Sequence, residues 1–345
     1  MKKSVITLSF LFCLSLYGTV LTVDNRIPSI GQYATIQAAH DAANDGDGIY
    51  VYPSPNAYAA TSVTKLVHIT GGGWNLNPST TGSYNTRAGH FVFYSGSEGS
   101  SLSGLDVESV AIYADSVTMK HCRMSDWSNL VIDANQVCID QNQLFSILVS
   151  QNHSGVEISR NYIRGNGYGY YPGLNPASFV VMIEANCDVT LYNNIITNWY
   201  YNSSLDAHGV FIFGGGNQLL VNNSIRNFNE RGSIYCYGAS PVCINNVLTN
   251  DLGLNQVNCS YNVINSNADA LFIAWQNDDY HLAPGSPAIG AGENGIDCGA
   301  YGGVSPFNDN LNTPSLPTVI QLTAPTTIVP ADQPMPITIR ARTND

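Results

Sequence analysis

An eight-residue phrase that returns seven times constrains the fold of this chain more than any other feature. The phrase is apolar-x-apolar-x-x-Asn-x-apolar, and its copies read VTMKHCRM, VCIDQNQL, VEISRNYI, VTLYNNII, QLLVNNSI, PVCINNVL and VNCSYNVI. The sixth position of successive copies is occupied by Cys122, Asn142, Asn161, Asn194, Asn223, Asn246 and Asn262. The gaps between these positions are 20, 19, 33, 29, 23 and 16 residues, which is typical of stacked coils with loops of adjustable length.

Elementary geometry predicts how such coils stack. Alternation within the phrase places every second apolar side chain inside the stack. Asparagine at the sixth position tolerates the left-handed backbone conformation that a sharp bend requires. Equivalent residues of neighbouring parallel strands lie ~4.8 Å apart, so the asparagine amides of successive coils can hydrogen-bond along the stack. The repeat therefore predicts an all-β parallel β-helix. The alternative is a two-sheet β-sandwich with Asn-rich turns, although a sandwich does not need identical bends in register.

The N-terminal part of the chain predicts a cap for the first coil. Thr35 can cap a short helix through TIQAAHDAA, whose Ile36, Ala39 and Ala42 share one face. Such a helix would cover the open edge of the stack, which otherwise favours aggregation. The DGDG turn that starts at Asp45 also resembles a calcium loop, but its immediate passage into the strand IYVYP favours a plain turn.

Four segments of the chain resemble those of a known group of proteins. YATIQAAHDAANDGDGIYVYP, LVHITGGGW and GSEGSSLSGLDV resemble the opening coils of secreted bacterial right-handed β-helix proteins of the pectate-lyase-like superfamily. DYHLAPGSPAIGAGENGIDCGAYGG resembles the closing segment of many such proteins, and the resemblance covers roughly residues 30–304. It implies a right-handed β-helix and a secreted or cell-surface protein. It fixes no reaction, because the superfamily includes lyases, hydrolases and adhesins.

Both ends of the chain lie outside the predicted β-helix domain of residues 23–304. Residues 1–22 are typical of a signal peptide, with Lys2 and Lys3, an apolar stretch from Ile6 to Leu16, and a cleavage site after Thr22. No later apolar run is long enough to span a membrane. Residues 305–345 are predicted to be a linker and a partial β tail, whose style resembles the start of an immunoglobulin-like or sorting module.

Charge and cysteine content exclude some functions. The chain has 13 Lys and Arg against 25 Asp and Glu, so it lacks the cations that a nucleic-acid partner requires. Seven cysteines remain after residue 22, and none has zinc-site spacing. Cys243 and Cys259 share the third position of the phrase, so we expect them to stack inward on adjacent coils as buried thiols. A disulfide between them is the alternative, since the ~4.8 Å step is within its Cα range, although parallel side chains do not suit its dihedral.

The longest insertions between copies of the phrase predict a ligand-binding surface. RGNGYGYYPGLNPAS, NWYYNSSLDAHG and NFNERGS follow successive anchors and carry many aromatic residues. Exposed aromatic rings present flat apolar faces with polar tips, which suit stacking on sugars. The predicted polysaccharide-binding residues are Tyr168, Tyr170, Tyr171, Trp199 and Tyr201. The alternative is that these rings only pack over one another and cover the strands.

The same loops carry the candidates for chemistry. Aligning Gly209 with Gly232 places His208 beside Arg231, with Asp206 and Glu230 adjacent. A β-helix uronate lyase uses a base to remove the proton α to a carboxylate, while cations neutralise that carboxylate. His208 and Arg231 are thus catalytic candidates, and Asp206 and Glu230 are candidate calcium ligands. An ordinary surface salt-bridge patch is the structural alternative.

A second pair of acids predicts a different reaction. Asp133 and Glu184 occupy matching positions two coils apart, with Ser150 between them, near the ~6.5–9.5 Å carboxyl separation of inverting glycosidases. The paired Asp-Asp motif of polygalacturonases is absent from the sequence. The sequence therefore favours a polysaccharide-binding protein without proven activity. A polysaccharide lyase acting on acidic glycans is the alternative, and a glycoside hydrolase follows it.

Overall fold

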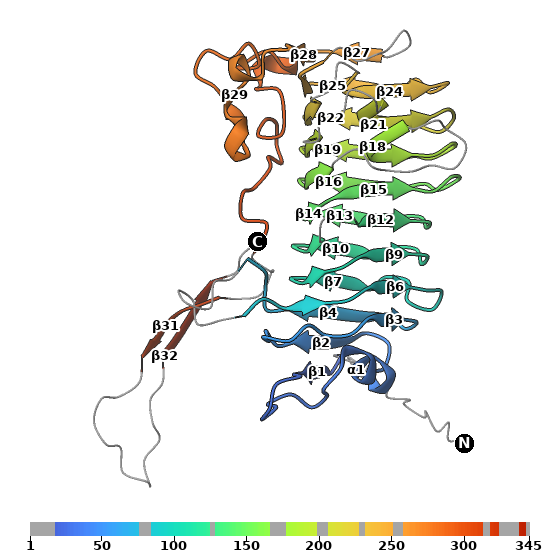
Figure 1. The fold of residues 1–345 in the computed structure, drawn as a ribbon, viewed down its shortest axis with the longest axis vertical. Helices are drawn as coiled ribbons and strands as arrows, with labels where there is room; N and C mark the ends of the chain where they lie inside the picture. Colours follow the sequence, from blue (N-terminus) through green and yellow to red (C-terminus); the bar gives the residue numbers. More distant parts are fainter. Residues whose placement is uncertain are drawn as a thin grey trace, which may run out of the picture.

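Three parallel sheets wind around one core in the computed structural model, which describes residues 18–75, 84–124, 128–165, 177–198, 206–227, 232–250, 258–312, 318–323 and 338–342. The sheets have 11, 9 and 8 strands, and every neighbour in each of them is parallel. We call them sheets A, B and C. Figure 1 shows the coils stacked in chain order, from the blue N-terminal end to the orange C-terminal end. The predicted right-handed parallel β-helix is confirmed.

Each coil contributes short strands to the three sheets in turn. Sheet A contains β1 (Val20–Val23), β2 (Asp47–Val51), β4 (Val67–Gly71), β7 (Ser101–Ser103), β10 (Thr118–Lys120), β13 (Cys138–Asp140), β16 (Val156–Ser159), β19 (Val189–Tyr192), β22 (Gln218–Val221), β25 (Val242–Ile244) and β27 (Asn258–Ser260). Sheet B contains β5 (Arg87–Ala88), β8 (Asp106–Val107), β11 (Arg123–Met124), β14 (Gln143–Leu144), β17 (Tyr162–Gly165), β20 (Ile195–Asn198), β23 (Ser224–Asn227), β26 (Val247–Leu248) and β28 (Val263–Ile264). Sheet C contains β3 (Thr61–Val63), β6 (Phe91–Phe93), β9 (Val110–Ile112), β12 (Asn129–Ile132), β15 (Ser146–Val149), β18 (Ala177–Ile183), β21 (Asp206–Phe213) and β24 (Ile234–Tyr237).

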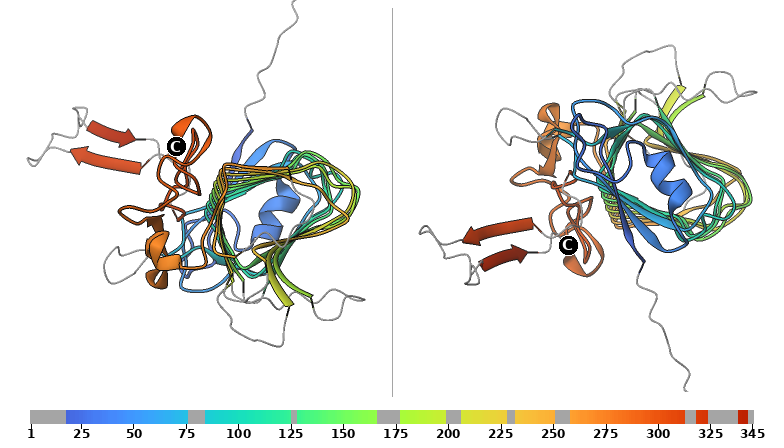
Figure 2. Two further views of the ribbon diagram at one scale, coloured as in Figure 1. Left: turned by 90° about the horizontal axis from the view of Figure 1, so that it is seen from above. Right: turned by 90° about the horizontal axis from the view of Figure 1, so that it is seen from below.

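The first coil is closed by the predicted helix α1 (Ile36–Ala42), which lies inside the outline of the stack in Figure 2. The Thr35 hydroxyl accepts a hydrogen bond from the Ala38 N–H at 3.1 Å, so the predicted N-cap is confirmed. Ile36 and Ala39 are buried as expected, but Ala42 is exposed. The buried face includes His40 instead, because its ring accepts the Thr64 N–H at 3.0 Å.

The six asparagine anchors form a continuous ladder inside the stack. The side-chain oxygen of Asn161 accepts from both the backbone N–H and the side-chain amide of Asn142, at 2.9 and 3.0 Å. The same two bonds link each anchor to the next, up to Asn262. Cys122 begins the column, and its N–H donates to Asn142 at 2.9 Å. The predicted ladder is confirmed.

The bend itself differs from the prediction by one residue. The left-handed backbone belongs to the residue before each anchor, with φ between 50° and 56° at His121, Gln141, Arg160, Asn193, Asn222, Asn245 and Tyr261. None of the anchors has a positive φ. The anchor turns inward to complete the ladder, so its neighbour must make the sharp turn. In each doubled Asn pair, the first residue therefore makes the left-handed turn and the second residue joins the ladder.

Strand β1 extends the β-helix to the N-terminal side of the predicted boundary at residue 23. Val20 pairs with Gly48 and Leu21 with Ile49, and Leu21 is buried in the core. The Asp47 carboxylate, which is also buried, accepts the N–H groups of Thr19 and Asn44 at 2.7 and 2.8 Å. The Asp47 carboxylate of the DGDG segment thus holds two backbone N–H groups in place. This is the role expected of a plain turn. The signal peptide itself stays a prediction.

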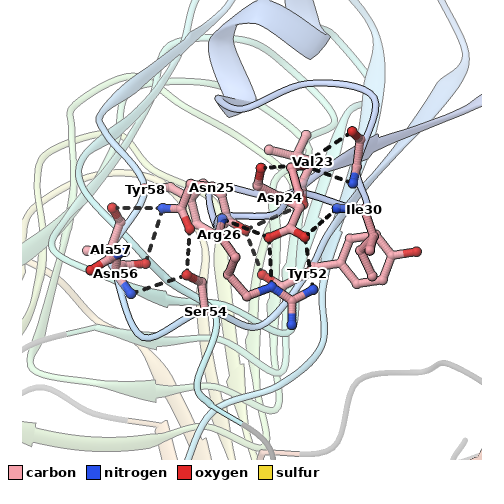
Figure 3. A network of polar contacts seen from close by, with 12 residues as sticks. Val23, Asp24, Asn25, Arg26, Ile30, Tyr52, Ser54, Asn56, Ala57 and Tyr58 are labelled. Carbon is pink, nitrogen blue, oxygen red and sulfur yellow. Dashed lines mark hydrogen bonds and ion pairs between the residues drawn. The ribbon is translucent and has the colours of Figure 1, made fainter.

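A polar network fixes the loop that follows β1, as Figure 3 shows. Asp24 is fully buried and accepts from both Arg26 guanidinium nitrogens at 2.8 and 2.9 Å. It also accepts the Ile30 N–H at 2.9 Å. The hydrogen bond from Arg26 lowers the pKa of Asp24 to about 2. The carboxylate therefore stays charged, and the loop is held against the first coil.

The closing segment folds back along the outer face of sheet B (Figure 1). It contains η1 (Ala268–Ala270), β29 (Phe272–Ala274), η2 (Trp275–Asn277), β30 (Asp279–Leu282) and η3 (Glu293–Gly295). The side-chain amide of Asn193 donates to the carbonyls of Ala300 and Gly302, at 2.8 and 2.7 Å. Asn245 accepts the Glu293 N–H at 2.8 Å. The outward member of a doubled Asn pair thus holds the closing segment.

The predicted β tail contains one antiparallel pair, β31 (Thr318–Thr323) and β32 (Thr338–Arg342). No helix within the described ranges has the length and apolar character needed to cross a membrane. The domain limits predicted at residues 304 and 305 stay a prediction.

Cys243 and Cys259 are direct register partners in β25 and β27, as predicted. Cys243 is buried, but Cys259 is exposed, because β27 is the last strand of sheet A and no coil covers it. The expectation of two buried thiols is therefore wrong for Cys259. Hydrogen bonding to Cys259 raises the pKa of the Cys243 thiol, and the same bond lowers the pKa of Cys259.

We predict that Asn194→Ala destabilises the protein by ~1–3 kcal/mol, because the N–H and the amide of Asn161 lose their acceptor in the core. Urea unfolding measures the effect. Asn217 is an exposed asparagine, and the control Asn217→Ala is expected to change stability by less than ~0.5 kcal/mol. Equal effects of the two substitutions would contradict a structural role for the ladder.

We predict that a chain starting at Val23 is less stable than one starting at Thr19. The shorter chain loses the burial of Leu21 and the pairing of β1 with β2, and burying one leucine contributes ~1.5–3 kcal/mol. Thermal unfolding of the two chains compares them directly. Identical unfolding temperatures would show that residues 19–22 add nothing to the first coil.

We predict that Cys259 is alkylated by iodoacetamide well before Cys243 in the folded protein. Cys259 is exposed and its pKa is lowered, so its reactive thiolate forms more readily. Peptide mass spectrometry after short exposures gives the order of labelling. Labelling of Cys243 first, or a crosslink between the two residues in the folded protein, would refute this expectation.

Candidate functional site

A column of seven residues runs along the outer face of sheet C. Each of these residues directly follows the last inward-facing residue of a strand, so the alternation of side chains turns it outward. The strand register aligns Phe93, Ile112, Ile132, Val149, Ile183, Ile212 and Cys236 across the sheet. The residues after them form the outer column: Tyr94, Tyr113, Asp133, Ser150, Glu184, Phe213 and Tyr237.

Aromatic rings occupy both ends of this outer column. Tyr94 and Tyr113 lie nearly parallel, with ring centroids 6.0 Å apart and an interplanar angle of 22°. Their exposed fractions are 44% and 46%, so the stacked pair faces solvent. At the other end, the rings of Phe213 and Tyr237 are 5.9 Å apart, and Tyr237 is 63% exposed. Partly exposed aromatic rings thus occupy both ends of the outer column.

Carboxylates occupy the middle of the outer column. Asp133 accepts a hydrogen bond from the His153 Nε2 at 2.7 Å, and Glu184 accepts the Gln151 N–H at 2.9 Å. Ser150 lies between the two acids, as the sequence predicted. Two coil steps correspond to ~9.6 Å between the backbones of Asp133 and Glu184. The predicted register of these acids is confirmed, while their role in hydrolysis stays a prediction.

His208 lies on the same face but is buried. Its ring stacks on Tyr235 at 4.7 Å and meets the edge of Phe211 at 5.9 Å. Its Nδ1 lies 3.1 Å from the Gly232 carbonyl oxygen, which fits a donated N–H. The register pairs Val210 with Ile234, and this places His208 opposite Gly232. The predicted alignment of Gly209 with Gly232 is therefore wrong by one residue, because the loop length alone did not reveal where pairing begins.

The other residues of the predicted loop site lie outside the described side chains. Asp206 is the first residue of β21, and its side chain is not described. The remaining candidates belong to loops that the structure does not describe: Tyr168, Tyr170, Tyr171, Trp199, Tyr201, Glu230 and Arg231. Their sugar-binding, catalytic and calcium-binding roles stay predictions.

The described cations concentrate on sheets A and B and at the N-terminal coils. Asp140 on sheet A is buried, lies 3.5 Å from Lys120, and accepts from Arg160 at 2.8 and 2.6 Å. Burial alone would raise the pKa of Asp140, but the hydrogen bond and charge of Arg160 outweigh burial and lower it. On sheet B, Arg123 pairs with Asp106. These pairs stabilise the outer faces of their sheets.

The described side chains include no group of three or more His, Cys, Asp or Glu residues that could hold a metal ion. The side chains of the predicted calcium ligands Asp206 and Glu230 lie outside those that the structure describes. A calcium site in the loops therefore stays a prediction.

Comparison with known proteins adds little to this description. No family model and no curated protein matches the chain. Among solved structures, the chain is similar to the crystal structure of pectate lyase Pel9A, with a TM-score of 0.42 and 13% identity. The match covers 82% of this chain and 96% of that chain. The β-helix assignment rests on the strand register of this chain itself.

The sequence interpretation missed the aromatic members of the outer column. Tyr94, Tyr113 and Tyr237 end the segments FVFY, VAIY and IYCY, in which two apolar residues alternate before a ring. This pattern is a second repeat, offset from the Asn phrase and belonging to sheet C. It was visible in the sequence, but only the aligned strands show that its final residues share one face.

Proposed function

We propose that this protein binds polysaccharide along the outer face of sheet C. The observation that carries the proposal is the exposed parallel pair Tyr94–Tyr113, aligned with Phe213 and Tyr237 at the far end of the same column. Sugar rings have apolar faces that stack on aromatic rings, while their hydroxyl groups need hydrogen-bond partners. The polar residues between the two aromatic pairs offer such partners. An extended sugar chain lying along the stack would meet both kinds of contact.

The rigid coils support this function. Register fixes each ring and carboxylate at a regular spacing, so binding orders few side chains and loses little conformational entropy. The aromatic loop residues Tyr168, Tyr170, Tyr171, Trp199 and Tyr201 belong to the proposal as further sugar contacts, because their loops lead into strands of sheet C. The protein would then act at a cell surface or outside the cell, as its predicted signal peptide implies.

Hydrolysis is the second candidate function, and the register of Asp133 and Glu184 favours it. Two carboxylates on one face at about this separation suit inversion through an activated water. The lyase alternative depends on Arg231 with His208 and on calcium held by Asp206 and Glu230. Incubation with pectate, alginate and chondroitin, with detection of unsaturated uronates by absorbance and of new reducing ends, separates both reactions from binding alone.

We predict that Tyr113→Ala weakens binding to a glycan selected on an array by about fivefold, which corresponds to ~1 kcal/mol for one lost stacking contact. Calorimetry measures the change, and thermal unfolding confirms that the fold is retained. Tyr84 is similarly exposed, at 42%, but lies outside the outer column, so Tyr84→Ala should bind like the wild type. Unchanged affinity of the Tyr113 variant would remove this face as the binding site. Trp199→Ala tests the loop residues in the same way.

A further inference from the structure

The charge of the sheet C face differs from that of the other two sheets. Neither its eight strands nor the residue that follows each of them contains a lysine or arginine. Its ionisable residues in the outer column are Asp133 and Glu184. His153 adjoins this column, and its Nε2 already donates to Asp133. In the described part of the chain, this face is therefore acidic.

The lysines and arginines whose side chains the structure describes are engaged elsewhere. Five of them pair with carboxylates: Arg26, Lys120, Arg123, Arg160 and Arg164. Lys65 donates to three carbonyls around the end of α1, and Arg87 donates to the Pro55 carbonyl. The Arg226 guanidinium lies 3.5 Å from the centroid of the Trp275 ring. A uronate on the sheet C face would thus meet carboxylates and no described guanidinium or ammonium group.

We infer that the glycan on this face is uncharged, a neutral polysaccharide and not a uronate polymer; this inference rests on the proposed function. A carboxylate accepts hydrogen bonds only, and among the described residues Asp133 and Glu184 each accept from one partner, so further acceptor positions remain. Sugar hydroxyl groups can fill these positions as donors. A uronate carboxylate has no proton to donate and is repelled by like charge. The overall charge of −12 adds to this repulsion at low salt.

The geometry also separates neutral sugars from cationic ones. Asp133 already accepts a hydrogen bond from His153. The exposed part of the column is mainly aromatic. Hydroxyl-rich sugar rings therefore match this face better than a run of ammonium groups does. Amino-sugar polymers therefore enter the experiment as a competing outcome. The two carboxylates act as hydrogen-bond acceptors for the neutral chain and as a barrier against acidic chains.

Calorimetry tests the inference with the full secreted protein and five probes: cellohexaose, xylohexaose, mannohexaose, hexagalacturonate and hexaglucosamine. The salt concentration is kept at about 0.01 M, where the Debye length is about 30 Å and charge effects are large. We expect at least one neutral hexasaccharide to bind at least tenfold more tightly than hexagalacturonate and hexaglucosamine. Tighter binding of either charged probe would overturn the inference, while binding of none of the five would overturn the proposed function as well.

The isosteric double variant Asp133→Asn with Glu184→Gln separates charge from shape. We expect hexagalacturonate to gain at least fivefold in affinity because the like charges are removed, while the neutral probe loses affinity because an amide oxygen accepts hydroxyl hydrogen bonds more weakly than a carboxylate. The double variant Tyr94→Ala with Tyr113→Ala should lose neutral binding by more than tenfold, with Tyr84→Ala as its control. If the charge variant leaves hexagalacturonate binding unchanged although the tyrosine variant loses neutral binding, the charge inference fails and the binding face stands.

Discussion

The asparagine ladder is the interaction on which the rest of this β-helix depends. From Asn161 onward each anchor oxygen accepts two hydrogen bonds from the coil before it, and the anchor amides up to Asn246 donate to the coil after them and to buried carbonyls. A bend inside a stack leaves backbone N–H groups without strand partners, and a buried unpaired group costs ~1–3 kcal/mol. The ladder removes that cost at every coil. It therefore permits the sharp left-handed turn beside each anchor, and with it the angle between sheets A and B.

The doubled asparagines extend this role from the inside of the stack to its outside. Asn194 and Asn246 complete the ladder, whereas Asn193 and Asn245 turn left-handed and reach the closing segment. That segment covers apolar residues of sheet B such as Ile195 and Val247. One local motif thus joins the core to a covering layer. On sheet C, Tyr94, Tyr113 and Tyr237 of the outer column are exposed.

A regular stack also explains how single residues come together in the proposed binding surface. The step of one coil carries each outward residue along a straight line, so single residues from distant parts of the chain form one column. Tyr94 and Tyr237 are separated by 143 residues in sequence and belong to the same face. Their proposed role in sugar binding depends on this alignment, since a single exposed tyrosine is common on protein surfaces. The absence of lysine and arginine from the described strands of sheet C gives the face its proposed selectivity.

The sequence by itself determined the stack. The repeat identified all six ladder asparagines, the register of Asp133, Ser150 and Glu184, and the pairing of Cys243 with Cys259, because these depend on hydrogen bonding between adjacent coils of similar pattern. Only the tertiary structure decided what each position faces. It placed the left-handed bend one residue earlier, buried His208 against Tyr235, and exposed Cys259 on the final strand. Exposure depends on which coil or segment lies above a residue, and that neighbour is set by packing between parts of the chain far apart in sequence.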